Sequence, residues 1–108
     1  MFKRLPDVTH LQFLILEALS GGEQAGRDLR ARLVAHRVRS SGPAFYQMMG
    51  RLEQGGLVDG WYDQKLVDGQ NLKERRYRLT RRGARALADT RRFYLDRPAL
   101  SPARKVHA

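Results

Sequence analysis

The stretch RSSGPAFYQMMGRLEQGGLVDGW, residues 39–61, decides how this chain is expected to fold. Within residues 43–54, apolar side chains recur at helical spacing, because each residue of a helix turns by about 100°. These residues are Phe45, Met48, Met49 and Leu52. Ser41 or Gly42 suits the cap in front of this helix, and the pair Gly55–Gly56 suits its end. The opposite face carries small or polar residues, so the pattern predicts a short amphipathic helix with one buried face.

Two helices are expected before this one. Thr9 and Gln12 have the spacing of a capping box at the start of the first. Its apolar side chains fall on two faces, with Leu11, Leu14, Ile15, Ala18 and Leu19 on one and Phe13 and Leu16 on the other. Such a helix has two surfaces to bury, one in the domain core and one against a second subunit. The second helix is expected over residues 24–38, which leaves a turn of about four residues, as a helix-turn-helix requires.

A β-hairpin and a last helix are expected after the third helix. Residues 57–66 read as a strand, DGQN at 68–71 as a turn and KERRYRLT at 73–80 as the return strand. Thr80 can cap a helix over about 81–97, whose inward residues are expected to be Ala84, Leu87, Ala88, Tyr94 and Leu95. Residues 98–108 are expected to form a flexible tail. The predicted fold is mainly α with a small β-hairpin (α+β), a winged helix-turn-helix domain over 1–97 with a C-terminal dimerisation helix.

Composition narrows the classes of partner. Among 108 residues, Lys and Arg number 21 and Asp and Glu 11, a net charge of +10. This charge favours an anionic partner, with nucleic acid ahead of a membrane surface or an acidic protein. There is no cysteine, so disulfides and thiolate metal sites are excluded. The longest apolar run, residues 11–19, is too short to span a bilayer. We therefore expect a cytoplasmic protein with no membrane partner.

Residues that could carry catalysis lack the spacing that catalysis requires. His10, His36 and His107 stand far apart without a cluster of carboxylates, so no metal site is predicted. Neither a GxSxG motif nor a phosphate-cradling loop is present. The sequence predicts neither an enzyme nor a cofactor.

The third helix has the outer face of a helix that enters the major groove of DNA. Small and polar residues there let the backbone approach and let side chains reach base edges. Gln47 can pair with adenine through two hydrogen bonds, and Arg51 can reach guanine or phosphate. Ser40 and Ser41, at the start of the helix, suit phosphate contact. The sequence therefore predicts a recognition helix over 43–54.

The return strand of the hairpin supplies a second group of candidates. It carries Lys73, Arg75, Arg76 and Arg78, with Glu74 as the opposing charge. A basic wing over 57–79 can follow the DNA backbone or enter the minor groove. The neighbouring Trp61 and Tyr62 can pack the wing onto the body or stack on a base or ligand.

Three segments resemble, in order and spacing, the PadR-like transcriptional regulators: LQFLILEALSGGEQAGRDLRARL, GPAFYQMMGRLEQGGLV and RRYRLTRRGARALA. The middle segment is the most specific, because Phe45–Tyr46, RLE at 51–53 and GLV at 56–58 stand where the family commonly has LY, RLE and GLV. The resemblance covers residues 11–94 and fits the compact branch of the family. Two positions depart from it: EQAGRDL lacks the usual aromatic residue, and Gln47 replaces a proline.

The resemblance implies a homodimeric repressor on a palindromic operator in double-stranded DNA, with the third helix in the major groove and the wing on the flanking backbone. By position, it implies that Tyr46 contacts the DNA backbone and that Pro43 and Ala44 approach the groove. It also implies that the first and last helices build the dimer. The residues expected at that interface are Leu11, Phe13, Leu16, Leu87, Phe93 and Tyr94. A small-molecule effector, where one exists, would bind the cleft between protomers near Phe13, Trp61 or Phe93.

Two alternatives remain open at this stage. A winged-helix module can serve protein–protein contact, with the positive charge meeting an acidic partner. Large apolar residues on the outer face of the third helix would favour that reading. A nonspecific binder of DNA or RNA would instead show similar affinity for unrelated sequences.

Overall fold

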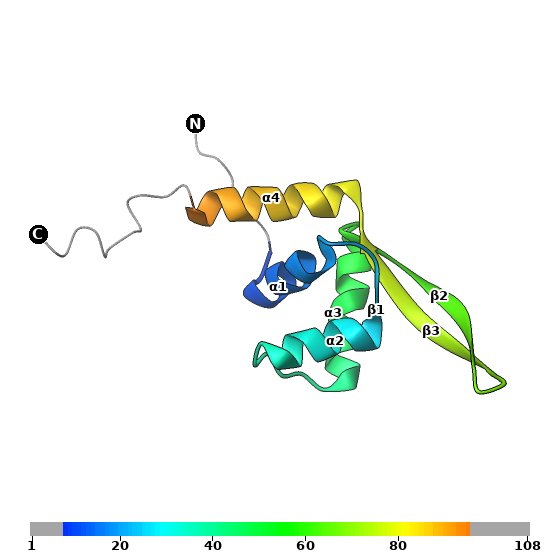
Figure 1. Ribbon diagram of the computed structural model, residues 1–108. Coiled ribbons are helices and arrows are strands. Elements are labelled where there is room, and N and C mark those ends of the chain that lie inside the picture. The colour runs from blue at the N-terminus through cyan, green and yellow to red at the C-terminus, as the bar shows by residue number, and fades with distance from the viewer. Residues whose placement is uncertain (1–7, 96–108) are drawn as a thin grey trace, which may run out of the picture.

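Residues 8–95 are described by the computed structural model (Figure 1). Their elements follow the order α1 (His10–Leu19), β1 (Gln24–Ala25), α2 (Gly26–Ala35), α3 (Gly42–Gln54), β2 (Val58–Val67), β3 (Gln70–Leu79) and α4 (Arg81–Leu95). The predicted fold class, a helical body with a β-hairpin, is confirmed. Residues 96–97 of the expected last helix and the expected tail at 98–108 lie outside the described residues.

The first helix begins as its sequence predicts. The Gln12 backbone N–H donates to Thr9 Oγ1 at 3.1 Å, and the Thr9 N–H donates to Gln12 Oε1 at 3.0 Å. The helix buries Ile15, Leu16 and Leu19. Leu16 was expected on the face opposite the core, which is wrong, because it packs inside the protomer with Ile15 and Leu19.

The second helix is shorter than expected. Gln24 and Ala25 form a strand that pairs with Tyr77 and Arg76 of β3, so α2 starts only at Gly26. It ends at Ala35, and Arg37 then adopts a left-handed conformation with a φ of 65°. Residues 36–41 therefore separate α2 from α3, which makes the turn longer than the four residues expected.

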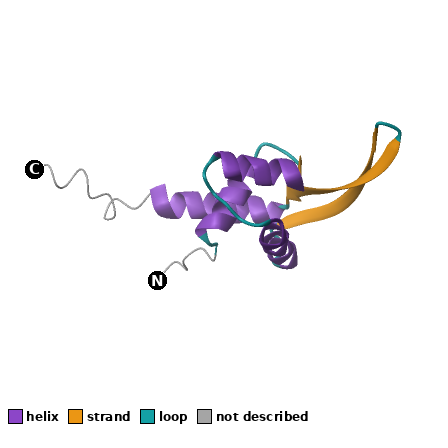
Figure 2. Cartoon of the chain, turned by 90° about the horizontal axis from the view of Figure 1, so that it is seen from below, coloured by secondary structure: helices purple, strands orange, loops and turns teal. Residues whose placement is uncertain are grey.

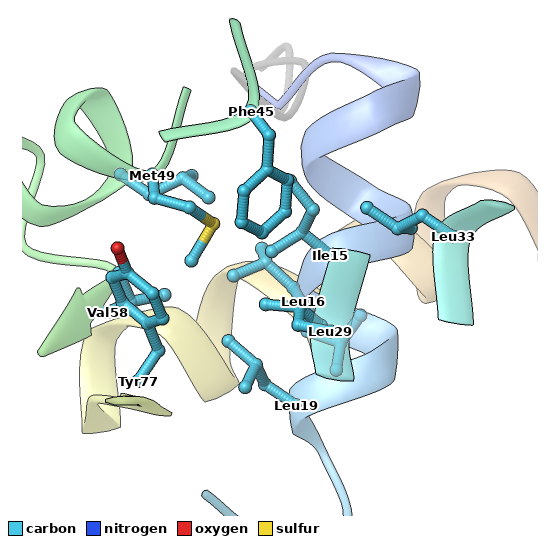
Figure 3. Close-up of a cluster of buried hydrophobic side chains, with 11 residues drawn as sticks. Ile15, Leu16, Leu19, Leu29, Leu33, Phe45, Met49, Val58 and Tyr77 are labelled. Carbon is cyan, nitrogen blue, oxygen red and sulfur yellow. The ribbon is translucent and has the colours of Figure 1, made fainter. Parts of the chain in front are cut away.

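One hydrophobic core joins the helices to the root of the sheet (Figure 3). Its members are Ile15, Leu16, Leu19, Leu29, Leu33, Phe45, Met49, Leu52, Val58, Tyr77 and Leu87. The third helix contributes the predicted Phe45, Met49 and Leu52, whereas Met48 is only partly buried. Ser41 caps this helix, since its Oγ accepts from the Ala44 N–H at 3.1 Å. The third helix is thus packed against the core by its apolar face, and its opposite face remains exposed to solvent.

The wing is a two-stranded ribbon that extends away from the helices (Figures 1 and 2). Its register runs from Val58 opposite Leu79 to Val67 opposite Gln70. Asp68 and Gly69 make the turn with positive φ angles of 50° and 76°, as a type I′ hairpin turn requires. The sheet order is β1-β3-β2, so the short β1 joins the body to β3.

The last helix packs on α1 with a different inner row from the one expected. Thr80 caps it, because the Gly83 N–H donates to Thr80 Oγ1 at 2.9 Å. The buried residues are Gly83, Leu87 and Thr90, of which only Leu87 was predicted. The other predicted inward residues are exposed, namely Ala84, Ala88, Tyr94 and Leu95. In the described part of the chain, no helix combines the length and hydropathy needed to cross a membrane.

Candidate nucleic-acid interface

The outer face of α3 is open to solvent and free of bulky apolar side chains. Pro43, Ala44, Gln47 and Arg51 are all exposed there. Gly50 lies on the same side, and a side chain at this position would meet nothing within 4 Å. This surface can come close to a partner and offers a carboxamide and a guanidinium to it.

The start of α3 combines a helix N-terminus with arginine side chains. Arg30 on α2 donates from Nη2 to the Ser40 carbonyl at 3.0 Å, which ties the turn to the body. Ser41 is exposed, Ser40 is half-buried, and Arg37 and Arg39 are exposed beside them. Sequence reasoning did not select Arg39, although a basic residue two positions before the capping Ser41 was a usable signal. Anionic groups are favoured at this end of a helix.

The wing is less basic than expected. Residues 58–79 carry Lys65, Lys73, Arg75, Arg76 and Arg78, but also Asp59, Asp63, Asp68 and Glu74, so five positive and four negative charges leave a net charge of +1. The prediction of a basic wing counted only the charges of the return strand. Three of the four acidic residues lie outside that strand, on β2 and in the turn. The wing as a whole therefore attracts phosphate weakly, and its individual cations matter more than its total charge.

Arg76 sits in an ion-pair cluster at the root of the wing. Its Nε donates to Glu23 at 3.0 Å and its Nη1 donates to Glu74 at 2.9 Å, while Arg27 pairs with Glu74 at 3.1 Å. The hydrogen bonds to Glu23 and Glu74 raise the pKa of Arg76. The hydrogen bond from Arg76 lowers the pKa of Glu74, against the opposing effect of burial. Arg76 thus holds β3 to the loop before β1, which competes with the phosphate contact expected of it.

Arg78 and Lys73 differ in whether an acidic side chain already pairs with them. Arg78 lies 3.5 Å from the Asp59 carboxylate, and its guanidinium lies 5.4 Å from the Trp61 ring centroid. Lys73 is exposed and forms no ion pair with any residue from 8 to 95. Lys73 is therefore the predicted wing cation best placed to meet an anion.

A polar recess lies between α3 and the wing. It is lined by Tyr46, Glu53, Tyr62, Lys73, Arg75 and Tyr77. Three of these were predicted DNA-contacting residues, Tyr46 from α3 and Lys73 and Arg75 from β3. The structure thus brings the two predicted contact elements together at one surface.

Within this recess, a positive and a negative side chain pair with each other. Arg75 donates from Nη2 to Glu53 Oε1 at 2.6 Å. Burial tends to lower the pKa of Arg75, but hydrogen bonds to Glu53 and Tyr77 outweigh this effect and raise it. Burial raises the pKa of Tyr77, with Arg75 opposing. Both groups keep their ordinary charge at neutral pH, and Arg75 is already neutralised by a carboxylate.

No protein-family model and no curated protein matches the sequence. Solved structures do match. PadR of Bacillus subtilis in complex with operator DNA has a TM-score of 0.61 at 24% identity, over 75% of this chain and 46% of that chain. A PadR family transcriptional regulator of Eggerthella lenta has a TM-score of 0.60 at 25% identity, over 75% and 70%. A Streptococcus mutans protein has a TM-score of 0.71 at 16% identity, over 99% and 97%.

This chain has the PadR winged-helix fold. It spans about half the length of the Bacillus subtilis protein and nearly all of the Streptococcus mutans one. The predicted order of a third helix, a β-hairpin and a last helix is the order observed in this chain.

The PadR fold of this chain also has an apolar groove between the start of α1 and the end of α4. The groove is lined by Val8, Thr9, His10, Phe13, Glu17, Thr90, Arg91, Tyr94 and Leu95. Arg91 donates to the Glu17 carboxylate across it. Two residues predicted at a dimer interface, Phe13 and Tyr94, therefore lie together on this groove.

The other predicted interface residues are placed differently. Leu16 and Leu87 are buried in the core, with exposed fractions of 0% and 3%, so their assignment to a dimer interface is wrong. Neither side chain has surface left for a partner. Leu11 and Phe93 are half-buried. Of the three residues suggested near an effector, Phe13 lines the groove, whereas Trp61, which lies on β2 against Arg78, and Phe93 do not.

Proposed function

We propose that this chain is a sequence-specific DNA-binding transcriptional regulator with α3 as its recognition helix. The observation that carries the proposal is the outer face of α3, where Gln47 and Arg51 stand among residues with little or no side chain. Backbone approach and side-chain reach are both needed for reading base edges. The alternative role as a protein-docking module would favour large apolar residues on this face, and the exposed residues there are small or polar.

The arginines around the start of α3 support the same proposal. Arg37 and Arg39 lie in the turn between α2 and α3, and Ser41 sits at the N-terminus of α3. Such groups bind backbone phosphates and fix the register of a helix on the duplex. Lys73 on the wing would add a contact to the flanking backbone, and Tyr46 a hydroxyl between the two. The solved PadR of Bacillus subtilis with operator DNA is consistent with this use of the fold.

We further propose that two copies act together as a homodimer on a palindromic operator in the cytoplasm. Tyr94 and Leu95, at the end of α4, are exposed by 64% and 79% and line the same groove as Phe13. A second copy would cover these apolar side chains and bring two recognition helices onto one duplex. Occupation of an operator blocks transcription when the site overlaps a promoter, so we propose repression, with a small-molecule effector taking the groove beside Phe13.

The experiment that tests the proposal is selection from random duplex DNA at near-physiological salt, followed by sequencing. An enriched inverted repeat, with half-sites about one helical turn apart, is the expected result. Binding without enrichment would replace the proposal with a nonspecific nucleic-acid binder. A folded protein that binds no DNA would overturn it in favour of the protein-docking role.

A further inference from the structure

One ion pair joins the recognition helix to the wing. Arg75 on β3 donates from Nη2 to Glu53 Oε1 on α3 at 2.6 Å. The side chains are 24% and 26% exposed, so the pair is largely withdrawn from solvent. The other ion pairs among residues 8–95 connect the wing to α2, to the loop before β1 or to itself, or lie on α1 and α4. Within that part of the chain, this pair is the charged link between the two elements proposed to contact DNA.

Two tyrosine rings hold the guanidinium of this pair in one place. Arg75 lies 4.8 Å from the Tyr62 ring centroid and 5.5 Å from that of Tyr77. Tyr62 is opposite Arg75 in the register of the wing, and Tyr77 follows two residues later on the same face. Cation–π attraction to both rings favours the observed position of the guanidinium. Arg75 is therefore a fixed point of the wing toward which Glu53 reaches.

Gly60 provides the space that the ion pair fills. A Cβ at this position would lie 2.7 Å from Glu53 Oε1 and 2.8 Å from Arg75 Nη2. No side chain larger than hydrogen fits there without displacing one of the two charged groups. The β2 strand thus lacks a side chain at the place where the charged link crosses it.

A carboxylate beside a recognition helix is unfavourable toward DNA, because it repels phosphate. Loss of the Glu53 charge would, by electrostatics alone, tighten DNA binding. The opposite outcome is expected if Glu53 acts through geometry. The sign of the change in affinity therefore separates the two roles.

We propose that Glu53 is a positioning residue that sets the angle between α3 and the wing, so that both meet one DNA duplex together. The inference rests on the proposed function of α3. Two DNA-contacting elements that are held at a fixed angle bind the duplex together. If the angle between them varies, ordering them on binding costs free energy and the affinity falls. Gly60 serves the same link by making room for it, and Tyr62 and Tyr77 serve it through their cation–π contacts with Arg75.

The first test compares Glu53→Gln with Asp59→Asn on the selected operator. Both substitutions remove one negative charge, but Asp59 pairs with Arg78 inside the wing and does not join it to α3. Glu53→Gln is expected to weaken binding by roughly tenfold or more, while Asp59→Asn leaves it unchanged or tighter. Hydroxyl-radical footprints, which report access to the deoxyribose backbone, should keep the backbone protection by α3 in Glu53→Gln and lose the protection by the wing. Equal or tighter binding by both variants would overturn the positioning role.

A second test needs no DNA. The chain has no cysteine, so Gln54→Cys on α3 and Gln64→Cys on the wing give two unique sites for spin labels. The distance distribution between these labels should be narrow with Glu53 and clearly broader with Glu53→Gln at an unchanged circular dichroism spectrum. An unchanged distribution would overturn the proposal. If the wild-type chain selects no operator, the proposed function fails, and the label distances still decide whether Glu53 fixes the wing.

Discussion

Gly50 is expected to serve the proposed DNA binding by α3 at a cost in stability. It lies in the interior of α3, where glycine is less favourable than alanine by about 0.5–1 kcal/mol. A methyl group there would meet no atom within 4 Å, so it would cause no clash in the protein. We expect Gly50→Ala to raise the free energy of unfolding and to weaken DNA binding, because the methyl group occupies the side that approaches the groove.

Urea denaturation and titration of the selected operator measure the two effects of Gly50→Ala separately. Gly21→Ala is the matched control, since Gly21 also has open space around it but lies in the loop after α1. A stabilised variant with wild-type affinity would mean that α3 does not approach DNA by the side that carries Gly50.

At the scale of elements, the sequence predicted what depends on local periodicity and caps. The face formed by Phe45, Met49 and Leu52 and the caps at Thr9 and Thr80 follow from spacing of three or four residues. β1 was missed because it has two residues, and its partners on β3 lie about fifty positions later. No local pattern contains such a pairing.

The inner row of α4 and the place of Leu16 were missed for a related reason. Apolar content suggested Ala84, Ala88 and Leu95 as inward residues, but the helix rotates to bring Gly83 against the backbone. A close approach of this kind depends on the loop before β2, which sequence periodicity in α4 cannot reveal. Among the candidate site residues, the exposure of those on α3 was predictable. The ion pairs that Arg75 and Arg76 form with glutamates depend on the three-dimensional arrangement.

Gly83, at the start of α4, is expected to be the least replaceable glycine of the described chain. A Cβ here would lie 1.9 Å from the Leu57 carbonyl oxygen, which is backbone and cannot turn aside. Gly83→Ala should lower the free energy of unfolding by about 3 kcal/mol, because the helix must shift away from the loop. Chemical denaturation compared with Gly21→Ala measures this loss. Wild-type stability in Gly83→Ala would show that α4 is not seated as closely as described.

The ion-pair cluster at the root of the wing should make its stability depend on pH. The pKa of Glu74 is lowered in the folded chain, chiefly by the hydrogen bond from Arg76. Its stabilisation is therefore complete above the unfolded pKa and is lost as pH falls through the lowered folded value. We expect Glu74→Gln to reduce the melting temperature more at pH 7 than at pH 3, as measured by thermal denaturation. An equal effect at both pH values would contradict an electrostatic origin.

At the scale of the whole molecule, positive charge is not concentrated on the recognition helix. On α3, Arg51 is balanced by Glu53, whereas α4 carries five arginines and one aspartate. Figure 1 places α4 on the far side of α1 from α2 and the start of α3. The net charge of the chain therefore exceeds the charge that a duplex bound at α3 would meet. Substitution of single arginines can show which of them contact DNA.

Arg39→Ala provides such a test when it is compared with Arg85→Ala. Both residues are exposed, and each substitution removes one positive charge. Arg39→Ala should weaken binding to all sequences alike and reduce the slope of log affinity against log salt by about 1. Arg85→Ala should change the slope much less, because α4 lies away from the outer face of α3. Titrations at several salt concentrations measure both slopes, and equal slopes would indicate nonspecific attraction by the whole surface.

The contact between Gly83 and the Leu57 carbonyl has a consequence for assembly. The Thr80 N–H also donates to that carbonyl at 3.1 Å, so the start of α4 is fixed directly to the chain between α3 and the wing. In a pair of copies joined through α4, the separation of the two recognition helices then becomes a fixed length. Such a dimer would bind only operators whose half-site spacing matches this length, and it would reject half-sites that lie on opposite sides of the double helix.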